Sequence, residues 1–142
     1  MKTLLPLILC VPIIMGFSEL ETDALADFKK ESKFINGTFV LCSLKVEANF
    51  AAYRIGGGTN GTPQTSKAVQ DCENELHTRL KDASNALRKA YDADQLKSAA
   101  IRDWYIDMNK GFESVKSQPA SAEHIADHFI TLSDDLIMKL EY

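Results

Sequence analysis

The segment from Ser66 to Tyr91 constrains the fold most, because its apolar residues recur at steps of three and four along about seven helical turns. Those residues are Val69, Cys72, Leu76, Leu80, Ala83, Leu87 and Tyr91. A stripe of this length predicts an amphipathic helix, with Thr65 or Ser66 as its N-cap. Such a helix is stable in water only when its stripe is covered, so the chain must supply further helices.

Two later segments carry the same pattern and predict two more helices. The first opens at a cap in Asp92–Gln95, with Gln95 at its N3 position, and ends near Gly111. Its apolar residues are Leu96, Ala100, Ile101, Trp104, Tyr105, Met108 and Phe112. Ser121 is the expected cap of the last helix. The stripe of that helix is Ile125, Phe129, Leu132, Leu136 and Leu140.

The first part of the chain also predicts helix, with one interruption. Asn36-Gly37 is expected to end a helical segment, and Thr38–Ile55 is apolar enough to form the first long helix. A glycine-rich loop then leads to the next helix. We therefore expect an all-α fold, with an antiparallel four-helix bundle over residues 38–142 and an N-terminal helical extension over residues 19–37.

The N-terminus has the order of a secretory signal peptide over residues 1–18. An apolar run follows Lys2 up to Met15, and small residues precede a cut after Ser18. The run is too short and too rich in proline to span a bilayer. We expect a secreted, extracellular protein with no membrane attachment once the signal is removed.

Composition excludes several classes of function. The 142 residues are 45% hydrophobic with a net charge of −4, which suits one globular domain and argues against nucleic acid as a partner. Motifs such as Gly-x-Ser-x-Gly and His-Glu-x-x-His are missing, so we expect no enzyme activity. His124 and His128 lie one turn apart but lack a third ligand. We interpret them as boundary residues of the bundle and expect no metal or other cofactor.

Two cysteines, Cys42 and Cys72, remain after the signal peptide, and an oxidising compartment favours a disulfide between them. Helix geometry argues against it, because the two lie 13 and 6 residues from the expected turn. At about 1.5 Å per residue they are offset by roughly 10 Å, which exceeds disulfide reach. The pairing therefore stays open. Two sequons, at Asn36 and Asn60, indicate N-glycosylation.

Four segments between Ser66 and Leu140 follow one another in a recognisable order. They read Ala68-Val69-Gln70-Asp71-Cys72-Glu73-Asn74-Glu75-Leu76, Ser98-Ala99-Ala100-Ile101, Asn109-Lys110-Gly111-Phe112-Glu113 and Ile130-Thr131-Leu132-Ser133-Asp134-Asp135-Leu136-Ile137-Met138-Lys139-Leu140. In this order and at these separations they resemble the plant invertase/pectin methylesterase inhibitor family. The resemblance covers a little over half of the mature chain.

This resemblance implies a secreted four-helix bundle with an N-terminal hairpin extension, located in the cell wall (apoplast) or alternatively in the vacuole. It also implies a non-catalytic protein that covers the active-site cleft of a cell-wall carbohydrate enzyme. Met108 stands where the family has a cysteine, so Cys72 lacks its usual partner, and Cys42 resembles the second cysteine of the family hairpin. The Pro-Lys-Phe tripeptide of invertase-type inhibitors is absent, which favours pectin methylesterase over acid invertase as the target.

The inhibitory surface is expected on the solvent faces of the helices that begin at Ser66 and at Asp92. Helical phase exposes Asn74, Thr78, Lys81, Asp82, Asp103 and Asp107 there. Two alternatives stay open. One is a divergent bundle that inhibits neither enzyme, and the other is a carrier that holds a small hydrophobic ligand in an internal cavity.

Overall fold

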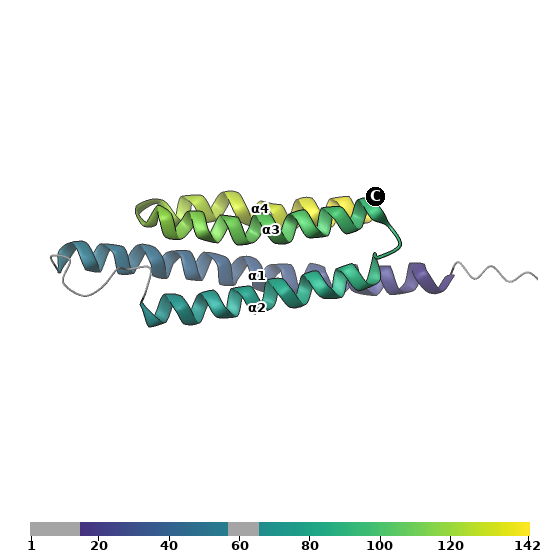
Figure 1. The fold of residues 1–142 in the computed structure, drawn as a ribbon, viewed down its shortest axis with the longest axis horizontal. Helices are drawn as coiled ribbons and strands as arrows, with labels where there is room; N and C mark the ends of the chain where they lie inside the picture. The colour runs from purple at the N-terminus through teal and green to yellow at the C-terminus, as the bar shows by residue number, and fades with distance from the viewer. Residues whose placement is uncertain (1–14, 57–65) are drawn as a thin grey trace, which may run out of the picture.

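The computed structural model describes residues 15–56 and 66–142, and within these the fold is all-α, as expected. Its elements are α1 (Met15–Ile55), α2 (Lys67–Ala90), α3 (Gln95–Ser117), a short 3₁₀ helix η2 (Pro119–Ser121) and α4 (Ala122–Glu141). The four α-helices lie side by side as a bundle, in which α1 extends beyond the other three at both ends (Figure 1).

Contacts between the helices show that α1 runs antiparallel to α4 and to α2. The salt bridge from Lys29 to Glu141 joins the first half of α1 to the end of α4. Glu47, further along α1, accepts a hydrogen bond from the backbone N–H of Glu123 at the start of α4. The pairs between α1 and α2 run in opposite order in the same way, from Glu31–Arg79 to Cys42–Cys72.

Aromatic rings fill the middle of the bundle. Phe28 of α1 meets Trp104 of α3 edge to face, with ring centroids 5.1 Å apart. Phe39 meets Phe112 edge to face at 5.8 Å and stacks on Phe129 of α4 at 6.3 Å. The whole predicted stripe of α2, from Val69 to Tyr91, is buried against this core. The sequence pattern therefore identified the inner face of α2 correctly.

The expected break at Asn36-Gly37 is wrong, because α1 is one continuous helix of 41 residues. Gly37 is exposed, so it costs the helix only its low propensity, about 1 kcal/mol relative to alanine. Ile35 and Phe39 on either side are fully buried, and burying such side chains stabilises by about 1.5–3 kcal/mol each. Residues 19–37 are therefore the first half of the longest bundle helix and not a separate element.

Three expectations about helix ends also need correction. Gly111 does not end α3, which continues to Ser117, because Gly111 is buried against α4 inside the bundle. The cap of α3 is Asp94 rather than Asp92, since the Asp94 carboxylate accepts from the N–H groups of the second and third helical residues. The side chain of Ser121 makes no capping hydrogen bond, and Glu47 supplies an acceptor from α1 instead.

Cys42 and Cys72 form a disulfide, with their Cα atoms 5.5 Å apart. The calculated offset assumed that α1 and α2 meet at a tight turn. Instead Ser66, at the start of α2, lies beside Asn49, whose side-chain amide donates to the Ser66 hydroxyl at 2.8 Å. Because α1 continues for six residues beyond Asn49, its end overhangs α2 by about 9 Å, and this stagger brings the two cysteines level.

Some expectations concern residues that the structure does not describe. Most of the expected signal peptide, residues 1–14, lies outside the described residues, as do Asn60 and most of the glycine-rich loop. The expected cut after Ser18 falls inside the first turns of α1. Cleavage and glycosylation of Asn60 thus stay predictions.

Candidate functional site on the α2–α3 face

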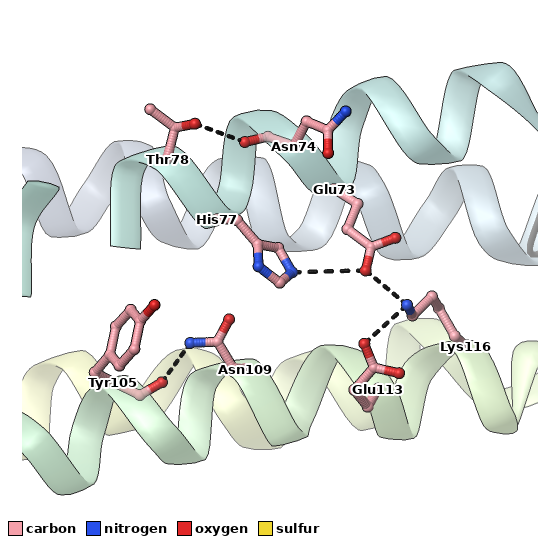
Figure 2. A network of polar contacts seen from close by, with 8 residues as sticks. All are labelled: Glu73, Asn74, His77, Thr78, Tyr105, Asn109, Glu113 and Lys116. Atoms are coloured by element: carbon pink, nitrogen blue, oxygen red, sulfur yellow. Dashed lines mark hydrogen bonds and ion pairs between the residues drawn. The ribbon is translucent and has the colours of Figure 1, made fainter. Parts of the chain in front are cut away.

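All six residues expected on the inhibitory surface are exposed. They are Asn74, Thr78, Lys81 and Asp82 on α2, and Asp103 and Asp107 on α3. Asn74 and Thr78 lie one turn apart, and the Thr78 hydroxyl donates to the Asn74 carbonyl at 2.9 Å. Both point away from α3 (Figure 2).

These residues do not form one surface. Asp82 lines a groove between α1 and α2, on one side of the bundle. Asp103 and Asp107 line a small hollow between α3 and α4, together with Asp135 and Lys139. Helical phase identified exposure correctly but could not tell which flank of each helix a residue occupies, because flank depends on where the neighbouring helices lie.

A polar network that sequence analysis did not predict joins α2 to α3 (Figure 2). The ammonium of Lys116 on α3 lies 2.6 Å from Glu73 Oε1 on α2 and 2.8 Å from Glu113 Oε1 on its own helix. His77 Nε2 lies 3.5 Å from the same Glu73 oxygen. The only sequence signal was the spacing of Glu113 with Lys116 and of Glu73 with His77, which suits pairs on one helix.

Lys116 is held in its charged form. Burial, the largest single effect, lowers the pKa of Lys116, but hydrogen bonds to Glu113 and Glu73 and the charges of both carboxylates outweigh it, so the pKa is raised above its ordinary value. The side chain is also packed over the Phe112 ring at 5.7 Å. Because Lys116 is charged and paired with two carboxylates, it links α2 to α3 and does not act as a nucleophile or base.

His77 adds an incomplete contact to this network. Its Nε2 is shielded from solvent and makes no hydrogen bond with the described part of the chain, although Glu73 is close enough to attract a protonated imidazole. On α3, the Asn109 side chain donates a hydrogen bond to the Tyr105 carbonyl at 2.7 Å. The α2–α3 face is therefore a preorganised polar surface whose side chains are held by contacts within and between the two helices.

A second polar chain crosses the bundle interior. Trp104 Nε1–H donates to the Ser133 hydroxyl at 3.2 Å, and that hydroxyl donates to Asn36 Oδ1 at 3.2 Å. The chain links α3, α4 and α1 and satisfies a buried indole N–H. The Asn36 amide, expected to be glycosylated, is thus half-buried and engaged against α4.

His124 and His128 are exposed at the start of α4 and line a shallow pocket with Asp127, Ser114 and Gln118. Among residues 15–56 and 66–142, no three His, Cys, Asp or Glu side chains come together in a way that could hold a metal ion. In the same residues, no helix combines the length and the apolarity that crossing a membrane requires.

The groove between α1 and α2 has a volume of about 650 Å³. It is lined by Leu20, Asp23, Ala24, Asp27, Phe28, Lys30 and Glu31 of α1, and by Asp82, Ala83, Ala86, Leu87, Lys89 and Ala90 of α2. Alanine contributes four of these positions, and its small side chain leaves the space between the helices unfilled. Sequence analysis did not predict this groove, although the three alanines in the last turns of α2, Ala83, Ala86 and Ala90, were its signal.

Comparisons of the chain with models of known protein families, with curated proteins and with solved structures find no match.

Proposed function

We propose that this protein is a secreted, non-catalytic inhibitor that binds a cell-wall carbohydrate enzyme and covers its active-site cleft. Pectin methylesterase is the first target and acid invertase the alternative. The proposal rests on the ordered segments between Ser66 and Leu140, which occupy α2, α3 and α4. Residues 19–37 form straight helix rather than the hairpin that the resemblance implies, so the proposed inhibitory surface belongs to the bundle itself.

The observation that carries the proposal is the solvent face of α2. Asn74, Thr78 and Lys81 are exposed on consecutive turns of a helix that is tied to α1 by a disulfide and to α3 by an ion pair. A rigid polar surface of this kind binds a partner with little loss of conformational entropy. The acidic character of the chain would also steer it towards a basic wall enzyme.

The test is a titration of the mature protein against a pectin methylesterase near wall pH, with an acid invertase in parallel. We expect stoichiometric loss of demethylation and unchanged invertase activity. Loss of invertase activity alone would support the alternative target. If both enzymes kept their full activity in the presence of protein shown to be helical, the result would contradict the proposal.

Two double variants test which part of the bundle forms the inhibitory surface. Thr78→Arg with Lys81→Glu on the outer face of α2 should weaken inhibition at least tenfold, since both side chains would lie in the contact. Asp103→Asn with Asp107→Asn alters the opposite flank without reversing any charge and serves as the control. If the α3 pair abolished inhibition and the α2 pair did not, the inhibitory surface would lie between α3 and α4 instead.

A second candidate, a carrier of small hydrophobic ligands, is favoured by the α1–α2 groove. Its volume lies in the range of small-molecule sites, and its floor is formed by Phe28, Ala83 and Leu87. Organic extraction of the purified protein followed by mass spectrometry tests this function. A stoichiometric lipid-like compound in the extract is the expected result for a carrier.

A further inference from the structure

The α1–α2 groove is held open between two cross-links. At one end the Tyr91 hydroxyl donates to the Glu21 carbonyl at 3.2 Å, and at the other Arg79 pairs with Glu31 at 2.7 Å. The groove-lining residues of α1 lie between Leu20 and Glu31, a length of about 16 Å along the helix. Its shape therefore suits an elongated molecule that lies parallel to the two helices.

The floor of the groove is apolar and is part of the bundle core. Phe28 and Leu87 are nearly inaccessible beneath it, and Ala24, Ala86 and Ala90 complete the floor and the inner walls. Such a surface takes up a saturated chain, because each buried methylene contributes about 0.8 kcal/mol.

The rim carries carboxylates on both walls. Asp23 and Asp27 lie on α1 and Asp82 on α2, and none of the three makes an ion pair with the described part of the chain. The two cross-links at the ends of the groove join residues whose numbers sum to 110 for Glu31 with Arg79 and to 112 for Glu21 with Tyr91. The numbers of Asp27 and Asp82 sum to 109, which sets these two residues within about one turn of each other across the groove.

The two lysines that line the groove, Lys30 and Lys89, are less well placed to neutralise Asp27 and Asp82. Lys30 follows Asp27 by three residues and, by helical phase, is turned further from α2 than Asp27 is. Lys89 lies two turns along α2 from Asp82, at the level of Asp23. The end of the groove near Asp27 and Asp82 thus presents two opposed carboxylates without an ion pair to the described residues, which a positively charged group of a ligand would neutralise.

We propose that the α1–α2 groove binds an amphipathic cation: a linear apolar chain lies on the Phe28–Leu87 floor and its amine lies between Asp27 and Asp82. The inference rests on the carrier function and adds the chemical class of the ligand. The carboxylates accept hydrogen bonds from the ammonium group, and the small side chains of the alanines leave room for the ligand's apolar chain.

Dodecylamine, dodecanol and dodecanoate, each below its micelle concentration, are suitable probes because they share one chain and differ in charge. Binding is read from the fluorescence of Trp104, the single tryptophan, whose ring contacts Phe28 in the groove floor. We expect dodecylamine to bind at least tenfold more tightly than dodecanoate. Asp27→Asn with Asp82→Asn should remove most of that preference while leaving dodecanol binding unchanged.

Ala86→Phe fills the groove without adding a second tryptophan and should weaken dodecylamine binding at least tenfold. Asn85→Phe, at the neighbouring exposed position outside the groove, is the matched control, and circular dichroism verifies that both variants fold. Equal affinity for the three probes, all blocked by Ala86→Phe, would overturn the cationic ligand but leave a carrier. Absence of binding by every probe, or binding that Ala86→Phe leaves intact, would overturn both the ligand class and the groove as a carrier site.

Discussion

Two glycines in helix interiors offer a direct test of the packing described above, because the same substitution should act in opposite directions. Gly111 lies in α3 against the Phe129 ring of α4, and a Cβ at this position would meet ring atoms at 2.4, 2.5 and 2.9 Å. At Gly37 in α1, no atom of residues 15–56 or 66–142 lies within 4 Å of a Cβ built there. Alanine gains up to about 1 kcal/mol over glycine in a helix at either site.

At Gly111 the packing cost exceeds this gain. An ordinary carbon contact is about 3.5–4.0 Å, so the Phe129 ring must retreat by about 1 Å. It cannot do so freely, because it also stacks on Phe39. Overpacking of this kind costs about 1–3 kcal/mol, so Gly111→Ala should be destabilised by about 1 kcal/mol, whereas Gly37→Ala should be stabilised by about 0.5–1 kcal/mol.

Urea unfolding followed by the fluorescence of the single tryptophan measures both values. In thermal melts, the two variants should move in opposite directions by a few degrees each. Phe129→Leu in the Gly111→Ala background removes the ring and should recover part of the lost stability as a coupling energy. Equal stabilisation by both alanines would refute the close approach of α3 and α4 at Gly111.

Three further predictions follow from the described contacts. Reduction of the disulfide, whose cysteines lie 30 residues apart, should lower the free energy of unfolding by about 3–4 kcal/mol, measured by urea unfolding with and without reductant. Ser133→Ala leaves the buried Trp104 N–H without its acceptor and should cost about 1–3 kcal/mol, whereas Ser114→Ala on the outside of α3 should change stability little. Burial, and then the charges of nearby carboxylates, raise the pKa of Tyr91 above its ordinary value near 10. Its contribution to stability is therefore complete below pH ~10 and is lost as the pH rises through the folded-state pKa, so Tyr91→Phe should flatten the alkaline fall of the urea midpoint.

Much of the fold was predictable because it depends on local pattern. Every residue of the α2 stripe is buried, and Ser66, one of the two residues expected as the N-cap, caps the helix. The failures share one cause. Gly37 and Gly111 were interpreted as helix breakers from their own propensity, but each is flanked by residues whose burial stabilises the helix by more than glycine costs.

The candidate site was less predictable than the fold. Helical phase found exposed positions on α2 and α3, yet it placed Asp82 and Asp107 on one surface although they lie on opposite flanks. The Glu73–Lys116 pair joins residues 43 positions apart, and no spacing within one helix indicates such a contact.

The sequence by itself determined which face of α2 is buried, since apolar periodicity and helix geometry are local properties. In α3 the expected stripe is buried at Ile101, Trp104, Met108 and Phe112, but Leu96 at its start is 85% exposed. In α4 the expected Ile125, Phe129 and Leu132 are only half-buried, and Ala122, Ala126 and Ser133 are fully buried instead. Only the tertiary structure decided how far the helices slide past one another. That stagger sets Cys42 level with Cys72 and places a groove where alanines of α1 and α2 face each other. The sliding of two packed helices depends on the sum of all contacts along their length, and no short segment of the chain contains that sum.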